Sequence, residues 1–82
     1  MDIFFKTDDI LLTSFLLTQG ISLVDIVQDN PNHFSFCLVG LDECKELKQK
    51  FLNNATAPAL ELFSKREMLI SEIKNKYREG NK

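Results

Sequence analysis

The chain has 82 residues and a formal net charge of −2, and 44% of its residues are hydrophobic, including seven phenylalanines. This length fits one domain, which buries roughly 60–65% of the surface that the unfolded chain exposes. The apolar content, with three glycines and two prolines, indicates a folded core rather than disorder. The nearly balanced charge lacks the basic excess that is typical of nucleic-acid-binding domains.

No secretory signal is visible, because Met1 and Asp2 are not followed by a cationic stretch ahead of an apolar one. The longest apolar region, residues 10–17, is interrupted by Thr13 and Ser14 and is far shorter than the ~20 residues that a membrane span requires. Two cysteines without an export signal indicate reduced thiols. We therefore expect a cytoplasmic protein that contacts no membrane.

The first half of the chain predicts a strand, a helix and a hairpin. Residues 2–6 are rich in strand formers, and the polar residues after them are typical of a helix N-terminus. A helix is expected over residues 8–19, with Gly20 ending it in a left-handed conformation. Strands are expected over residues 21–28 and 33–39, joined by a turn rich in Asp, Asn and Pro.

The strand over residues 33–39 has the most regular alternation in the chain. Its apolar residues are expected on one face and the others on the opposite face: Phe34, Phe36 and Leu38 against His33, Ser35 and Cys37. One face of the hairpin is therefore expected to be buried. Asp25 interrupts the apolar run of the preceding strand, and we expect it to face solvent.

The second half predicts two helices. The first, over residues 42–53, has Asp42 as its expected cap, Asn53 and Asn54 at its end, and an inner stripe of Cys44, Leu47 and Phe51. The second is expected over residues 58–79, beginning at Pro58, whose missing amide is harmless there.

These elements form one α+β domain, a small three-stranded sheet packed with helices in the order β-α-β-β-α-α. The strand order stays open, because the third strand fits either between the first two or at an edge.

Short motifs follow one another along most of the chain. They are Lys6-Thr7-Asp8-Asp9-Ile10, Phe15-Leu16-Leu17 with Gly20, Val24-Asp25-Ile26 and Asp29-Asn30-Pro31 before the Phe-rich strand, and Phe51-x-Asn53-Asn54 ahead of Phe63. In order and spacing they resemble DUF5659, a family of small bacterial and phage domains of unknown function. Asn54 stands where that family typically has Gly, and Pro58 is unusual at its position. The resemblance implies the β-α-β-β-α-α fold, carriage by phage or mobile elements, and no activity.

Candidate chemical groups do not assemble into a site. His33, Cys37 and Cys44 fall short of the four ligands of structural zinc, and His33 and Cys37 are separated by about 13 Å along one strand. We expect both cysteines to be buried as small hydrophobic residues and His33 to be solvated. Asp8 and Asp9 point about 100° apart on a helix, so capping explains them better than acid–base chemistry. We expect no enzyme, no metal, no cofactor and no small-molecule substrate.

The last predicted helix carries the strongest functional signal. Phe63, Ile70 and Tyr77 repeat every seven residues, and we expect the part from Phe63 to Ile70 to face the core. A helix of about 20 residues spans ~30 Å, whereas strands of five to seven residues span nearer ~20 Å. Its last turns, with Ile73 and Tyr77, are therefore expected to overhang the sheet and to bind a partner. Arg66 on this seam argues against an uninterrupted coiled coil.

The leading hypothesis is a non-catalytic interaction or assembly module of phage or mobile-element type, which self-associates through this helix as a dimer or binds another protein. The alternative is a nucleic-acid-binding accessory domain. It is motivated by basic residues beside an aromatic ring at the helix end: Lys74, Lys76, Tyr77 and Arg78. Inhibition of a host enzyme is a third hypothesis, which nothing in the sequence ranks.

Overall fold

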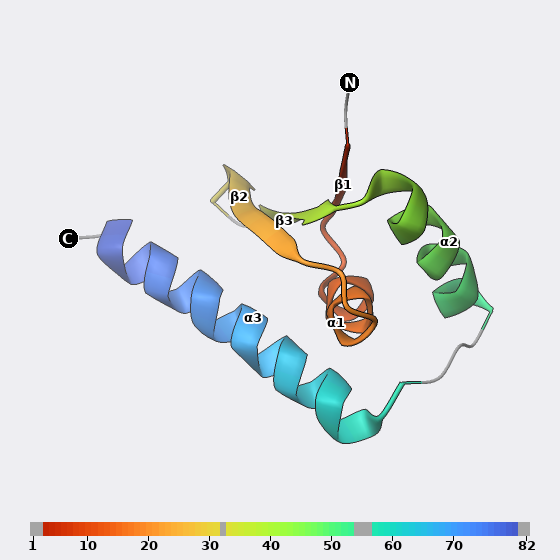
Figure 1. Ribbon diagram of the computed structural model, residues 1–82. Helices are drawn as coiled ribbons and strands as arrows, with labels where there is room; N and C mark the ends of the chain where they lie inside the picture. Colours follow the sequence, from red (N-terminus) through yellow and green to blue (C-terminus); the bar gives the residue numbers. More distant parts are fainter. Residues whose placement is uncertain (1–2, 32, 54–56, 81–82) are drawn as a thin grey trace.

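The structure, a computed structural model, describes residues 3–31, 33–53 and 57–80, with the last four of these given by their backbone alone (Figure 1). Three strands and three helices follow one another in the predicted order. They are β1 (Phe4–Thr7), α1 (Ile10–Thr18), β2 (Leu23–Asn30), β3 (His33–Val39), α2 (Leu41–Leu52) and α3 (Ala59–Gly80). The predicted α+β fold is therefore confirmed, and each bound lies within two residues of its expected place.

The strands form an antiparallel sheet with the order β1-β3-β2, so β3 is the central strand. This order settles the alternative that the sequence left open. Phe5 and Leu23 lie opposite Leu38 from the two sides, and Ile26 lies opposite Phe36. The pairing of β2 with β3 shifts between Leu23 and Asp25, which leaves an extra residue in the edge strand at this point.

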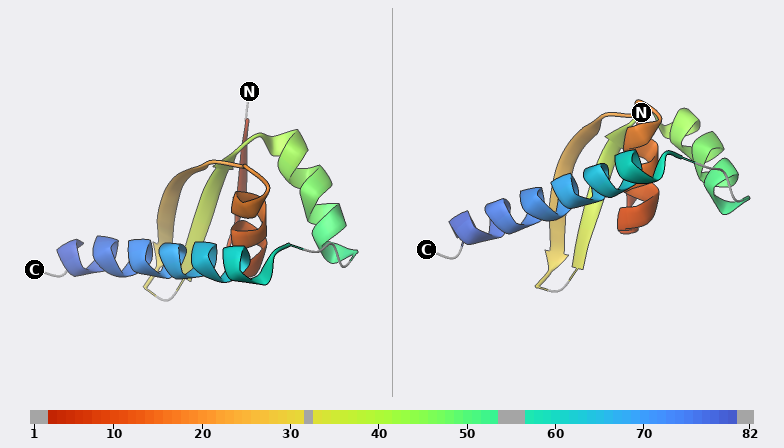
Figure 2. Two further views of the ribbon diagram at one scale, coloured as in Figure 1. Left: turned by 60° about the horizontal axis from the view of Figure 1, so that its bottom comes forward. Right: turned by 90° about the horizontal axis from the view of Figure 1, so that it is seen from below.

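Two of the helices, α1 and α3, are packed against one face of the sheet. Figures 1 and 2 show α1 and α3 crossing below this face, while α2 stands beside the end of the sheet where β1 lies. The second half of β3 alternates as predicted: Phe36 and Leu38 are buried toward the helices, while Cys37 on the opposite face is half-buried. The first half does not, because Ser35 is buried and Phe34 is half-buried. No helix in the described part of the chain covers this opposite face.

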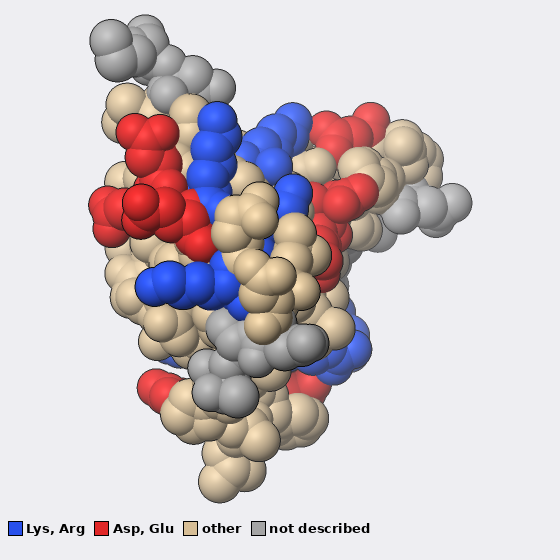
Figure 3. All heavy atoms as spheres, turned by 90° about the vertical axis from the view of Figure 1, so that its right-hand side faces the viewer, with Lys and Arg blue, Asp and Glu red and all other residues tan. Residues whose placement is uncertain are grey.

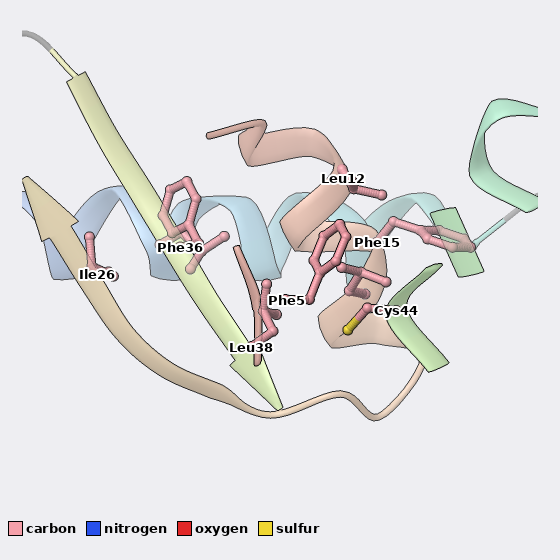
Figure 4. Packing of buried hydrophobic residues seen from close by; sticks show 9 residues of the cluster. Phe5, Leu12, Phe15, Ile26, Phe36, Leu38 and Cys44 are labelled. Atoms are coloured by element: carbon pink, nitrogen blue, oxygen red, sulfur yellow. The ribbon is translucent and has the colours of Figure 1, made fainter. Parts of the chain in front are cut away.

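The core lies between the sheet and the helices, as Figure 4 shows. Its buried hydrophobic residues come from all three strands and all three helices: Phe5, Leu12, Phe15, Leu16, Ile26, Phe36, Leu38, Cys44 and Leu69. The predicted inner stripe of α2 is confirmed, because Cys44 is buried, Leu47 packs against the core, and the Phe51 ring lies 5.4 Å from that of Phe15. This interior holds α1 between the sheet and the other two helices.

The ends of α1 follow the sequence signals. Asp9 has an extended backbone, and its carboxylate accepts hydrogen bonds from the amides of Leu11 and Leu12. The helix therefore begins at Ile10, two residues later than expected, since the capping residue itself is not helical. At the other end Gly20 has the predicted left-handed conformation (φ +92°), and the Ile21 amide donates to the Leu16 carbonyl.

The expected cap of α2 is wrong. Gly40 precedes the helix in a left-handed conformation (φ +90°), so the helix begins at Leu41 and places Asp42 within the first turn. The Asp42 carboxylate in this turn interacts favourably with the helix dipole, but it does not cap the helix. Asn53 ends α2 as predicted, whereas Asn54 lies outside the described residues. Pro58 directly precedes α3, and its carbonyl accepts from the Leu62 amide.

Candidate interaction surface

The face of α3 that packs against the domain is formed by Leu62, Leu69 and Ile73. These positions are seven and four residues apart, a spacing that places side chains on one face of a helix. Leu69 is completely buried, and the other two pack against the core from its margin. We call these three residues the inner stripe. They pack α3 against the core.

A second apolar group lies on the outside of α3. Leu60 is 84% exposed and Phe63 is 61% exposed. Among the large apolar residues that the structure describes, Leu52 alone is as exposed as Phe63, and none is as exposed as Leu60. The two side chains are three positions apart and are therefore neighbours on the helix surface. We call Leu60 and Phe63 the outer patch.

The expectation that Phe63 faces the core is wrong. One step along a helix is a rotation of about 100°, so Phe63 cannot share a face with its neighbour Leu62. Leu62 and Leu69 repeat at the same interval of seven as Phe63 and Ile70. The fold buries Leu69 and packs the half-buried Leu62 against the core, whereas Phe63 lies in solvent and Ile70 is half-buried.

Of the two predicted partner residues, Ile73 and Tyr77, the structure describes the side chain of Ile73 alone. The last turns of α3 extend beyond the sheet, as Figure 2 shows. Ile73 nevertheless packs on the core and is half-buried, so it belongs to the inner stripe rather than to a free surface. The side chain of Tyr77 lies outside the described part of the structure.

The basic residues at the end of α3 differ in their contacts with the rest of the chain. Lys74 is exposed, whereas the ammonium of Lys76 lies 3.3 Å from the Asp25 carboxylate and donates to the Ile26 carbonyl. The side chain of Arg78 lies outside the described residues. Elsewhere, on the side of the molecule where α2 lies, cations and anions are interspersed (Figure 3). The predicted nucleic-acid site therefore has one of its cations engaged within the chain.

The contact with Lys76 also explains Asp25. The sequence shows this residue as an interruption of an apolar strand, and the structure confirms that it is exposed. One of its carboxylate oxygens accepts a hydrogen bond of 2.8 Å from the Ile26 amide as well as the contact from Lys76. A groove of about 490 Å³ borders this site, between β2 and the turns of α3 that carry Glu72 and Lys76.

His33 is not simply solvated, contrary to expectation. Its Nε2 lies 2.8 Å from the Asp8 carboxylate, which comes from the segment between β1 and α1. Its Nδ1 lies 3.1 Å from the Asp29 carboxylate near the end of β2. Asp29 also accepts a 2.5 Å hydrogen bond from the Ser35 hydroxyl and lies 3.6 Å from the Lys6 ammonium.

This polar cluster perturbs its own titration. The hydrogen bond to Asp8, followed by that to Asp29, raises the pKa of His33 above its usual value. The hydrogen bond from His33 lowers the pKa of Asp8, and the hydrogen bond from Ser35 is the main cause of the lowered pKa of Asp29. The two carboxylates therefore stabilise the protonated form of the imidazole relative to the neutral form.

The geometry of this cluster fits a structural role better than metal binding or nucleophilic catalysis. The two ring nitrogens of His33 point in different directions, so Asp8 and Asp29 lie on different sides of the ring and do not converge on one ion. Within the described part of the chain no group of three His, Cys, Asp or Glu side chains has a metal-binding arrangement. Ser35 donates to Asp29 rather than to the imidazole, so the hydroxyl is not activated by the histidine as a nucleophile is.

The two cysteines differ. Cys44 is completely buried in the core, where its thiol donates to the Val39 carbonyl, and burial, aided by the charge of Glu43, raises its pKa. Cys44 therefore has the predicted role of a small hydrophobic residue. Cys37 is half-buried on the uncovered face of the sheet, so the same prediction for it is wrong. The helices cover one face of β3, which buries Phe36 and Leu38, and they leave Cys37 half-buried on the other face.

Comparisons with protein-family models, with curated proteins and with solved structures find no match to this chain. The resemblance to DUF5659 remains a prediction from the sequence. Among the described residues no helix combines the length and the apolar character needed to cross a membrane.

Proposed function

We propose that this protein is a non-catalytic interaction module, of the phage or mobile-element type, that self-associates through the outer patch of α3. The observation that supports this function is the exposure of two large apolar side chains, Leu60 and Phe63, side by side on one helix. Apolar side chains that adjoin on a regular element, unlike scattered single ones, are typical of sites that bind a protein.

A second copy of the chain suits this patch because the patch is self-complementary. A twofold axis between Leu60 and Phe63, with two α3 helices antiparallel, places Leu60 of each copy against Phe63 of the other. Symmetric interfaces of this kind use the same surface twice, and they are the commonest form of oligomer. The inner stripe on the other side of the helix holds α3 on the domain, so the patch is presented by a fixed surface.

The test is sedimentation equilibrium of the wild-type protein and of Leu60→Ser/Phe63→Ser from 5 to about 300 μM. We expect the wild type to dimerise in this range, and the double variant to dimerise at least tenfold more weakly because the buried apolar area is lost. Leu52→Ser is the matched control, since Leu52 is as exposed as Phe63 but lies on α2. Unfolding by urea at a concentration where the wild type is monomeric should give similar stabilities for all three proteins, since these side chains are exposed.

A wild-type protein that remains monomeric throughout this range contradicts the proposal, and so does a Leu52→Ser effect equal to that of the double variant. Nucleic-acid binding is examined in parallel by fluorescence anisotropy with single- and double-stranded oligonucleotides at low salt. Tight, salt-sensitive binding that Lys74→Glu abolishes, with a monomeric protein, would replace the proposal by the nucleic-acid alternative.

A further inference from the structure

The outer edge of β2 has an unusual arrangement at Ile26. Since β2 pairs with β3 on one side alone, its other side is an edge of the sheet. Both backbone groups of Ile26 face this edge: its amide donates to the Asp25 carboxylate at 2.8 Å, and its carbonyl accepts from the Lys76 ammonium. The positions that a neighbouring strand would occupy are thus taken by two side chains.

These two side chains form one unit, because the Asp25 carboxylate and the Lys76 ammonium also lie 3.3 Å apart. We call them the edge cap. One partner comes from the strand itself, and the other comes from α3, 51 residues further along the chain. An uncapped edge strand is a template for pairing with another chain, and charged side chains are one of the means by which proteins block such pairing.

The cap is held weakly. The side chains of Asp25 and Lys76 are 58% and 54% exposed, and ion pairs at such exposure contribute little because water and salt screen them. The space beside the cap is open as well, since the groove of about 490 Å³ between β2 and α3 borders Leu23, Val24, Asp25 and Ile26. α3 therefore reaches this edge through Lys76 without filling it.

We infer that the edge of β2 around Ile26 is a pairing surface for β2 of a second copy of this chain, kept closed by the Asp25–Lys76 edge cap. In an antiparallel pair, two residues that lie opposite each other exchange both of their N–H···O bonds. Ile26 presents its donor and its acceptor on the same side, so twofold symmetry pairs Ile26 with Ile26 of the other copy. The two sheets then join into one of six strands.

This surface is distinct from the outer patch of α3, so the experiment removes that patch first. The background protein is Leu60→Ser/Phe63→Ser, and the cap is removed from it by Asp25→Ala/Lys76→Ala. The control carries Asp42→Ala/Lys74→Ala, which deletes one exposed acid and one exposed base away from the edge. Sedimentation equilibrium should show a dimer dissociation constant at least tenfold lower for the cap-less protein than for the background or the control.

Hydrogen exchange at the Ile26 amide identifies the surface. In the cap-less protein this amide loses its Asp25 acceptor, so its exchange should be fast at low concentration and at least tenfold slower where the dimer forms. Val24→Lys, which adds a charge to the exposed side chain beside Ile26, should return the cap-less protein to a monomer and its amide to fast exchange.

The inference is overturned if the cap-less protein associates no more than its background, or if it associates without slowing the Ile26 amide. Protection of this amide by an added peptide strand, with no self-association, also overturns the second copy as the occupant. Lys76→Met keeps the aliphatic stem and removes half of the cap. If far-UV circular dichroism shows that the double variant does not fold, Lys76→Met takes its place. This variant is expected to lower the dimer dissociation constant as well, and an unchanged dissociation constant overturns the inference.

Discussion

Along α3, Leu62 and Leu69 are seven residues apart, as are Phe63 and Ile70, yet Leu69 is completely buried while Phe63 is 61% exposed. The two pairs differ by a single step of the helix, about 100° of rotation. Heptad spacing therefore defines stripes on a helix, while the angle at which the helix meets α1 decides which stripe enters the core. The inner stripe stabilises the domain, and the outer patch is the surface that we propose for binding.

Leu69→Ala should produce the largest loss of stability on this helix. Because Leu69 has no exposed surface, its truncation removes apolar contacts and leaves a cavity, and we expect the free energy of unfolding to fall by about 2–5 kcal/mol. Urea denaturation measures the change. Met68→Ala, at the exposed neighbouring position, is the control and should change stability by roughly 0.5 kcal/mol or less. Equal effects at the two positions would contradict the assignment of the inner stripe.

Ile73→Ala should have an intermediate effect. Ile73 packs against the core while remaining half-buried, so we expect a loss of about 1–2 kcal/mol, less than for a fully buried aliphatic residue. Its dimer dissociation constant, measured below the unfolding transition, should equal that of the wild type. A variant of full stability but weaker association would restore Ile73 to the binding surface that the sequence predicts.

His33→Gln should have the smallest effect and one that depends on pH. His33 has a raised pKa, so its stabilising contribution is complete below its ordinary value of 6.5 and is lost as the pH rises through the raised value. Asp8 and Asp29 have lowered pKa values, so their contributions are present above their ordinary value of 3.8 and are lost as the pH falls through the lowered ones. The difference in stability between wild type and His33→Gln should be greatest between pH 3.8 and pH 6.5, the two ordinary values.

Thermal unfolding of wild type and His33→Gln from pH 3 to 9 measures this difference. Gln28→Asn, at an exposed position in the same hairpin, is the control for changes unrelated to the imidazole. A difference that grows toward pH 9 would show that the imidazole acts in its neutral form. This cluster borders α3 at Ile73, ten residues beyond Phe63, and not at the outer patch. Neither variant should therefore alter association, which keeps the comparison between the inner stripe and the outer patch free of pH effects.

The features that the sequence predicts well depend on residues close together in the chain. Asp9, Gly20 and the alternation of β3 from Phe36 to Leu38 act over a few positions, and all three are as the sequence predicts. The features missed depend on contacts between distant residues. His33 meets Asp8 across 25 positions, and Lys76 meets Asp25 across 51.

The two heptad pairs of α3 illustrate the same limit. Periodicity alone does not distinguish the burial of Leu69 from that of Ile70, because both lie seven residues after another apolar residue. The choice depends on how α3 is placed against α1, which no local pattern specifies. Leu60 could have been identified from the helical spacing, since it lies three positions before Phe63 and almost opposite to Leu62.

The central position of β3 has a consequence for the route by which the chain folds. β2 and β3 are joined by a short turn, so this pair closes a small loop and can form early. β1 pairs with the other side of β3, with Thr7 opposite Phe36 and Phe4 opposite Val39. The loop that this pairing closes contains α1 and β2, so it is much longer than the turn between β2 and β3. Closing the longer loop carries the greater entropic cost, and the N-terminal strand is therefore expected to be the last to join the sheet.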